Sequence, residues 1–213
     1  MVTEDRLEVM APIVRARRPD VPLLVVTRAV AEAVTGYDVH RGILAAADRP
    51  PPCSIDSVVR SARTVVVLED LTDQVNIGSV FRNAAALGAD AVMLSPSCGD
   101  PLYRRAVRVS MGAVLTLPFC RSSHWPGDLS VLGAAGFCVY ALTPDSDAEP
   151  LAALRPSDIN RVALVLGSEG PGLTSAALCA ADRRVRVEMA PGADSLNVAT
   201  AAAVALYSIA RRR

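Results

Sequence analysis

Residues 64–87 read TVVVLEDLTDQVNIGSVFRNAAAL, a valine-rich run followed by a helical pattern. The run 64–69 is short and rich in β-branched residues, which is typical of a buried strand. Four apolar residues then recur at helical spacing, namely Ile77, Val80, Ala84 and Leu87. This spacing predicts a helix over 77–87 with one apolar face, and it leaves Arg82 on another face.

Strand-like and helix-like segments continue to alternate along the rest of the chain. Further strands are predicted at 91–95, 114–119, 137–142, 161–166 and 185–189. Further helices are predicted at 102–111, 129–135, 174–181 and 196–212. Strand and helix in strict turn predict an α/β domain with a mostly parallel sheet and helices on both faces. In such sheets ligands bind beyond the carboxyl ends of the strands.

The first 54 residues are predicted to form a small separate α/β unit, ahead of a larger domain that spans 55–213. This unit contains an apolar, strand-like run at 21–26 and a helix-like stretch at 29–34. The tripeptide Pro-Pro-Pro at 50–52 follows, and it is typical of a stiff extended linker.

The formal net charge of the 213-residue chain is zero, and all 22 basic residues are arginine. A neutral protein has no global field that attracts nucleic acid, so an RNA site must be a local patch. Arginine-rich runs at 15–18, 104–108 and 211–213 are either solvated faces or candidate phosphate contacts. Aromatic residues make up only 4% of the chain, which argues against a platform of stacked rings.

The five cysteines are scattered and form no C-x-x-C pair: Cys53, Cys98, Cys120, Cys138 and Cys179. Their spacing argues against a disulfide framework and a zinc site, and it favours buried, reduced thiols. His40 and His124 lie far apart and have no metal-like cluster around them. Neither a signal peptide nor an apolar run of membrane-spanning length is visible, so a cytoplasmic protein is predicted.

Three loops, at 73–84, 166–173 and 190–200, have compositions that suit ligand binding or catalysis. In the first, Asn76 is predicted to cap the helix, and Gly78 would let a ligand approach the helix start. In the second, at 166–173, three glycines suit a loop whose backbone amides face a ligand, although a tight structural turn would look the same. In the third, Ser195 is a plausible cap of the last helix, with or without a further role.

The glycine-rich loop 166–173 differs from several familiar motifs. It lacks the Gly-Lys-Ser/Thr of a P-loop, and its serine lacks the frame of a hydrolase nucleophile. It also departs from the dinucleotide fingerprint in spacing and lies near the end of the chain. Glu188 nevertheless stands near the offset of the acid that binds ribose in that fold, so an NAD-dependent oxidoreductase stays open as an alternative.

Taken in order, the three loops resemble the motifs of the SpoU/TrmH family of RNA ribose 2′-O-methyltransferases, in the SPOUT superfamily. The matching segments are Asn76-Ile-Gly-x-x-x-Arg-Asn-Ala84, Leu166-Gly-Ser-Glu-Gly-x-Gly-Leu173 and Ser195-Leu-Asn-Val-Ala199. The resemblance covers 64–213 and implies an α/β fold with a C-terminal trefoil knot, a rare exception to unknotted chains. It also implies an S-adenosylmethionine (SAM) cofactor, an RNA substrate and a homodimer.

The resemblance further implies the role of individual residues. The implied catalytic residues are Arg82, Asn76, Glu169, Ser195 and Asn197. The implied cofactor-binding residues are Leu142, Thr143, Leu166, Gly167, Ser168, Gly170, Val187, Met189 and Leu196, and no metal is implied. Arg82 of one subunit would face the cofactor bound in the other. Residues 1–54 resemble part of an L30e-type RNA-binding domain, which favours ribosomal RNA over transfer RNA.

The family mechanism makes the arginine of the first motif the base that deprotonates the ribose hydroxyl, helped by a substrate phosphate. Arginine keeps its proton up to about pH 12, so we favour a different role. In this hypothesis Arg82 grips the adjacent phosphate and orients the 2′-hydroxyl, and the proton leaves to phosphate or water. A non-catalytic RNA-binding protein with the same fold is the second alternative, which cofactor binding without methyl transfer would support.

Overall fold

The computed structural model describes residues 1–154, 160–190 and 192–210. The chain forms two compact units, Met1–Pro51 and Pro52–Arg213. The arginine run at 211–213 and the end of the helix predicted over 196–212 lie outside the described residues. The assignment of the first 54 residues to an L30e-type domain stays a prediction.

The N-terminal unit contains a two-stranded parallel sheet and two α-helices. Strand β1 (Val2–Thr3) pairs with β2 (Val25–Val26), and η1 (Glu4–Arg6) leads into α1 (Leu7–Arg17). Helix α2 (Arg28–Thr35) confirms the helix-like stretch, and the Thr27 hydroxyl caps it. The strand-like run at 21–26 shrinks to two residues, and α1, which has Pro12 inside it, was not predicted.

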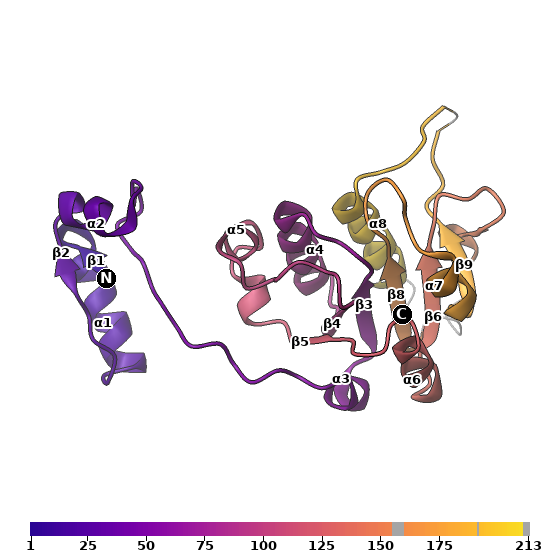
Figure 1. The fold of residues 1–213 in the computed structure, drawn as a ribbon, viewed down its shortest axis with the longest axis horizontal. Helices are drawn as coiled ribbons and strands as arrows, with labels where there is room; N and C mark the ends of the chain where they lie inside the picture. The colour runs from indigo at the N-terminus through magenta and orange to yellow at the C-terminus, as the bar shows by residue number, and fades with distance from the viewer. Residues whose placement is uncertain (155–159, 191, 211–213) are drawn as a thin grey trace. The chain divides into compact units, whose positions relative to one another are not determined.

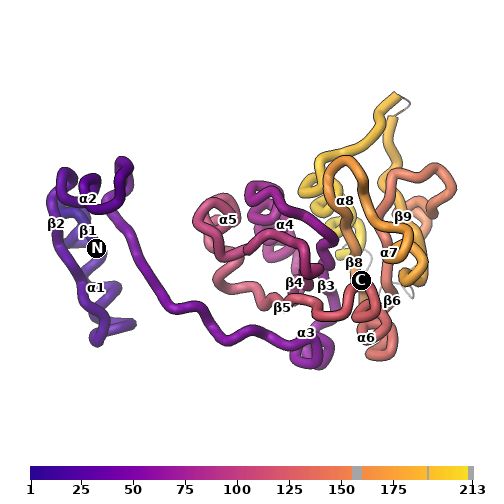
Figure 2. Tube along the Cα trace, viewed as in Figure 1, coloured from indigo at the N-terminus to yellow at the C-terminus, as the bar shows by residue number. Residues whose placement is uncertain are grey.

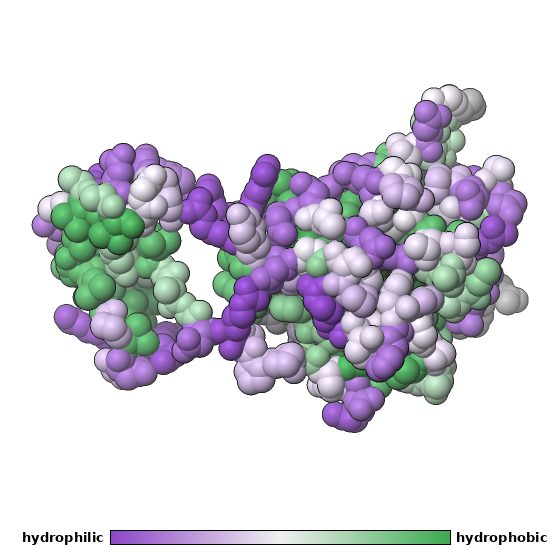
Figure 3. Space-filling model, viewed as in Figure 1, coloured by the Kyte–Doolittle hydropathy of each residue, from purple (hydrophilic) through white to green (hydrophobic). Residues whose placement is uncertain are grey.

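Apolar side chains remain exposed on this N-terminal unit. Val34 is 72% exposed, Val9 61% and Leu24 60%. Figure 3 shows a broad hydrophobic area over these 51 residues. A small unit of this length buries little apolar surface, because surface area is large relative to volume in short chains.

The second unit is built on a seven-stranded sheet in the order β5-β4-β3-β8-β6-β9-β7, in which every pairing is parallel (Figure 1). The strands are β3 (Thr64–Leu68), β4 (Ala91–Leu94), β5 (Phe119–Arg121), β6 (Cys138–Leu142), β7 (Glu149–Pro150), β8 (Val162–Leu166) and β9 (Arg183–Arg186). The parallel α/β prediction is therefore confirmed.

Helices cover both faces of this sheet. They are α3 (Ile55–Ser61), α4 (Gln74–Ala86), α5 (Arg104–Val109), α6 (Asp128–Ala134), α7 (Ser175–Ala180) and α8 (Val198–Ala210), with 3-10 turns η2 (Ala113–Leu115) and η3 (Leu151–Ala153). Along β3, Val66 and Leu68 pack in the core beneath α4 and α8. Val65 and Val67 point the other way, into the core beneath α3 and α6. The alternation follows from the two-residue period of a strand.

Two of the predicted strands differ from the observed ones. Residues 114–119 were predicted as a strand, but Val114 lies in η2 and β5 begins only at Phe119. Val114 and Leu117 are buried by a tight turn packed on α4 rather than by strand pairing, so their apolar pattern was misleading. The strand predicted at 185–189 is β9, which begins two residues earlier and ends at Arg186.

The order of the strands creates a switch point in the middle of the sheet. From β3 the chain moves outward through β4 to β5, whereas β8 and β6 lie on the other side of β3. Helix α8 packs against α4 (Figure 2). A deep trefoil knot in this region stays a prediction. Ligands of such sheets bind at a switch point, beyond the carboxyl ends of the strands.

Candidate active site

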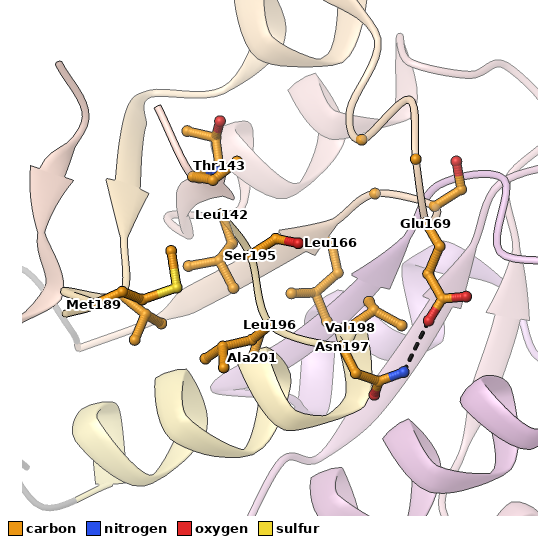
Figure 4. Close-up of a pocket in the computed structure, with 16 residues that line it drawn as sticks. Leu142, Thr143, Leu166, Glu169, Met189, Ser195, Leu196, Asn197, Val198 and Ala201 are labelled. Atoms are coloured by element: carbon orange, nitrogen blue, oxygen red, sulfur yellow. Dashed lines mark hydrogen bonds between the residues drawn. The ribbon is translucent and has the colours of Figure 1, made fainter. Parts of the chain in front are cut away.

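A cavity of about 370 Å³ lies beyond the carboxyl ends of β6, β8 and β9, against the start of α8 (Figure 4). All the residues for which the resemblance implies cofactor contact line it: Leu142, Thr143, Leu166, Gly167, Ser168, Gly170, Val187, Met189 and Leu196. Four residues that were not predicted as site residues line it as well, namely Pro144, Gly172, Val198 and Ala201. The structure thus brings together segments that are more than 50 residues apart in the sequence.

The wall of the cavity formed by 167–172 is a tight glycine turn. The Gly172 N–H donates to the Ser168 carbonyl over 3.1 Å, and Gly170 and Gly172 have φ values of 86° and 71°. A Cβ atom on Gly167 would lie 2.3 Å from the Gly172 carbonyl carbon. Only glycine fits there, so the loop is both a structural turn and a wall of the cavity.

The rest of the cavity is mainly apolar. Leu142 and Leu166 lie at the ends of two strands, and Figure 4 shows Met189 at one side of the site and Glu169 at the other. The Thr143 hydroxyl accepts a hydrogen bond from the Asp145 N–H over 3.3 Å. Glu188, the acid that kept a dinucleotide site open, is exposed and is not part of the cavity wall. An apolar cavity with a few polar groups is typical of a site for a small organic molecule.

The three sequence motifs meet in a triangle of side chains. Glu169 Oε1 accepts hydrogen bonds from Asn76 Nδ2 and from Asn197 Nδ2, both over 2.8 Å. Asn197 Nδ2 also donates to Asn76 Oδ1 over 3.0 Å. Each corner comes from a different sequence motif, and bonds to a carboxylate are stronger than bonds between neutral groups. The triangle therefore fixes the glycine loop against the starts of α4 and α8.

The two predicted helix caps are wrong. Asp73 caps α4, since its Oδ1 accepts from the N–H groups of Val75 and Asn76. Asn76 lies inside the helix, where its side chain is free to join the triangle. Asn197 Oδ1 accepts from the Ala199 N–H over 3.0 Å and so caps α8. Ser195 precedes this cap, is exposed and lines the cavity.

Arg82 lies apart from the cavity. It is exposed on α4, does not line the cavity and has no hydrogen-bond or ion-pair partner among the residues that the structure describes. The next residue, Asn83, is tied down, since its Nδ2 donates to the Ala199 carbonyl over 2.8 Å. Helix α4 is thus held firmly against α8 while the guanidinium of Arg82 reaches solvent. Of the predicted catalytic residues, Glu169, Ser195 and Asn197 line the cavity. Asn76 is hydrogen-bonded to two of them, whereas Arg82 neither lines the cavity nor bonds to a residue that does.

A buried carboxylate that the sequence did not reveal supports the far end of the glycine loop. Glu69 is 1% exposed and accepts hydrogen bonds from Trp125 Nε1 over 2.6 Å and from the Thr174 hydroxyl over 2.7 Å. Its second oxygen accepts from the Thr174 N–H over 2.8 Å. Thr174 caps α7, directly after the loop. The position of Glu69, an acidic residue directly after a buried strand, is the sequence signal that could have predicted this role.

Other kinds of site are not found in the described part of the chain. No group of three or more potential metal ligands occurs in 1–154, 160–190 or 192–210. No described helix is long and apolar enough to cross a membrane. The cysteines are free thiols; Cys98 and Cys120 are buried as predicted, but Cys179 is exposed.

A parallel α/β unit with a glycine-walled cavity beyond its strand ends defines a protein that binds a small organic ligand. The chain belongs to the SpoU rRNA Methylase family, whose sequence profile matches residues 63–207. An uncharacterised tRNA/rRNA methyltransferase of Mycobacterium tuberculosis is 52% identical over 179 residues, which is 84% of this chain. A second, from Synechocystis, is 34% identical over 77% of this chain. The chain spans 62% and 56% of the length of these two relatives.

Solved structures share the fold. The AdoMet-bound rRNA methyltransferase of Sinorhizobium meliloti superposes with a TM-score of 0.78 and 25% identity, over 99% of this chain and 78% of that one. An RNA 2′-O ribose methyltransferase superposes with a TM-score of 0.68 and 26% identity, over all of this chain and 78% of that one. The family that the three motifs resembled is thereby confirmed.

Proposed function

We propose that this protein is a SAM-dependent RNA methyltransferase that methylates a ribose 2′-hydroxyl. The observation that carries the proposal is the triangle of Asn76, Glu169 and Asn197, two of which line the cavity. It joins all three motifs of the family in one place. A methyltransferase of RNA is what the relatives' names describe, and the attack by a ribose hydroxyl is the finer part of the proposal.

The cavity fits SAM. Its volume of about 370 Å³ lies within the range of pockets that hold small organic ligands. Leu142, Leu166 and Val187 would pack against the faces of the adenine ring, and Thr143 and Ser168 would supply polar partners. The close packing at Gly167 keeps side-chain atoms out of the loop and leaves its backbone next to the ligand. When bound, SAM supplies an electrophilic methyl group.

The reaction needs positioning more than charge stabilisation. Alignment of two reacting groups in a site supplies about 7–11 kcal/mol of the barrier. Asn76, Glu169 and Asn197 hold the walls of the cavity by hydrogen bonds. Ser195 lines the cavity and offers a hydroxyl that can orient the ribose. The amide groups of the triangle donate to Glu169 and so keep its carboxylate fixed.

Arg82 would complete this site from a second copy of the chain. The guanidinium grips the phosphate next to the target ribose through its planar fork of donors. It holds the 2′-hydroxyl in place, and the hydroxyl proton passes to phosphate or water. This arrangement explains why Arg82 is exposed and unpartnered in the described single chain while the cavity is complete.

Ribosomal RNA is the proposed substrate in preference to transfer RNA. The support is the resemblance of the N-terminal unit to the RNA-binding domain of ribosomal-RNA members, together with the AdoMet-bound rRNA methyltransferase that superposes on the chain. The relatives in sequence are named for both RNA classes, so the experiment must offer both.

The test is transfer of labelled methyl from SAM to unmodified ribosomal and transfer RNA, by the wild type and by Arg82→Ala. The product is digested with alkali, because only 2′-O-methylation leaves resistant dinucleotides. Resistant label in ribosomal RNA that is lost in the variant supports the whole proposal. Label that alkali releases contradicts the ribose assignment. Cofactor binding without any label contradicts the enzyme and supports a non-catalytic RNA-binding protein.

A further inference from the structure

Two segments of the second unit have an unusual charge composition. No aspartate or glutamate occurs between residues 101 and 127, which contain four arginines, or between 74 and 89, which contain Arg82. The whole chain has equal numbers of acidic and basic residues. Positive charge without nearby acidic residues in the sequence is therefore found on the helices that these two segments form, α4 and α5.

These elements lie against one another. Helix α5 contacts α4, and η2 contacts both. The crossing occurs at Gly78, where an added Cβ atom would lie 2.6 Å from the Ala106 carbonyl oxygen. Arg82 follows Gly78 by four residues, so it lies on the same stripe of α4, one turn beyond the crossing. On α5, Arg105 and Arg108 are three residues apart and also share one face.

Arg121 and three exposed arginines of this region differ in whether their guanidinium groups have partners. Arg121 is used internally, because its guanidinium donates to the backbone carbonyls of Ser95, Pro96, Cys98 and Gly99. Arg82, Arg105 and Arg108 are exposed and have no ion-pair or hydrogen-bond partner within the described residues. These three guanidinium groups thus keep all their donors for another molecule.

Large side chains stand beside these arginines at the surface. Tyr103 is 58% exposed, Met111 67% and Leu115 65%. Met111 has a φ of 54°, in the left-handed region that costs a side-chain-bearing residue about 1–2 kcal/mol. Such strained residues concentrate at functional sites. We define the α5 face as Arg105, Arg108, Tyr103, Met111 and Leu115.

We propose that the α5 face is the docking surface for the RNA strand that leads to the target ribose. The proposal rests on the proposed function and adds the path of the substrate to it. Arg105 and Arg108 bind successive phosphates, Tyr103 stacks on a base, and the strand continues to Arg82 on the neighbouring helix. RNA is favoured over a protein partner because the surface pairs unneutralised arginines with an exposed aromatic ring, which suits phosphate and base together.

The experiment measures binding of a labelled, mixed-sequence single-stranded RNA to the full chain across a salt series. Arg105→Ala and Arg108→Ala are each compared with Arg60→Ala, which removes an exposed arginine from α3 on the opposite face of the sheet. Each α5 variant should bind RNA about 3- to 10-fold more weakly, with a salt slope smaller by about 0.7, because one phosphate contact is lost. Arg60→Ala should match the wild type.

Two substitutions of Tyr103 test whether its aromatic ring contributes to RNA binding. Tyr103→Ala should weaken binding, whereas Tyr103→Phe should restore it, because stacking needs the ring and not the hydroxyl. In methyl transfer, the α5 variants should raise KM for RNA and leave KM for SAM and kcat unchanged.

The possible outcomes separate the docking surface from the enzyme. Methyl transfer with unchanged RNA affinity and salt slope in the α5 variants overturns the docking surface and leaves the enzyme standing. A changed oligomeric state with unchanged RNA binding also overturns it and assigns the face to protein contact. A wild type that neither binds nor methylates RNA overturns both proposals.

Discussion

The cofactor cavity and the surroundings of Arg82 differ in how many of their polar side chains have hydrogen-bond partners within the chain. At the cavity, three loops are tied together by hydrogen bonds of 2.8–3.0 Å, and the glycine loop folds back on itself. Around Arg82, the helix backbone is anchored through Asn83, but the guanidinium has no partner among the described residues. One chain forms the cavity, whereas the Arg82 guanidinium is exposed and can bind another molecule.

This difference separates two tasks of the proposed enzyme. Binding of SAM should depend only on residues of one chain, since every wall of the cavity comes from it. Transfer of the methyl group should also need Arg82, which a single chain does not bring to the cavity. Substitutions in the two regions should therefore have separable effects on affinity for SAM and on turnover.

The largest effect is expected for Arg82→Ala. We expect kcat to fall about 100- to 1000-fold, because the variant loses a preorganised donor to the substrate. The affinity for SAM should change by no more than about twofold, as for surface substitutions away from a site. Steady-state kinetics and calorimetry measure the two quantities, with Arg60→Ala as control. Near-full activity of Arg82→Lys would contradict a role for the bidentate fork.

Gly167→Ala should lower the affinity for SAM, which Arg82→Ala leaves unchanged. The new Cβ atom would lie 2.3 Å from the Gly172 carbonyl carbon, so the loop must open. Overpacking of this kind costs about 1–3 kcal/mol, which corresponds to a loss of SAM affinity of about 5- to 150-fold.

The matched control for this substitution is Gly133→Ala, where no heavy atom lies within 4 Å of the new Cβ atom. Gly133 is in α6, so the control should stabilise the fold by about 0.5–1 kcal/mol and leave SAM binding unchanged. Unaltered SAM binding by Gly167→Ala would show that the loop is not a wall of the cofactor site.

A smaller effect is expected for Glu169→Gln. The neutral amide still offers one acceptor oxygen, but the charge that strengthens both bonds from Asn76 and Asn197 is lost. We expect kcat/KM for SAM to fall about tenfold, in line with loss of one charge-assisted bond. Thermal unfolding should hardly change because Glu169 is exposed. A large loss of stability would mean that the triangle supports the fold rather than the site.

The sequence predicted the strands and helices of the molecule better than the side-chain hydrogen bonds that connect them. Valine-rich runs revealed β3, β4, β6 and β8, because strands buried on both faces are apolar throughout. The capping roles of Asn76 and Ser195 were wrong, since Asp73 and Asn197 offered equivalent side chains a few residues away. The triangle could not be predicted from spacing, because it depends on how distant loops meet.

The smallest effect on either region is expected for Asp128→Asn. Burial raises the pKa of the Asp128 carboxyl, but hydrogen bonds from the Ser122 hydroxyl and from the N–H groups of His124 and Ser123 outweigh it. The net pKa lies below its ordinary value. Because the folded pKa is lower than the unfolded one, the carboxylate stabilises the fold above the unfolded pKa. This stability is lost as the pH falls through the folded pKa.

The variant should therefore unfold about 1–2 kcal/mol more easily at neutral pH, with a difference that disappears in acid. Chemical denaturation across a pH series measures the difference. SAM binding and turnover at neutral pH should match the wild type, because Asp128 lines neither the cavity nor the surface around Arg82. A constant difference at all pH values would mean that the carboxylate charge is not what stabilises this loop.

The most direct test uses dimers that contain two different chains. Arg82→Ala and Gly167→Ala chains are expressed together with different tags, the mixed dimers are purified, and activity is measured at a SAM concentration too low to saturate the Gly167→Ala cavity. If Arg82 acts on the cavity of its partner, each mixed dimer holds one complete site and should show about half of the wild-type activity. Mixed dimers without activity, despite normal SAM binding by the Arg82→Ala chain, would contradict a site shared between two copies of the chain.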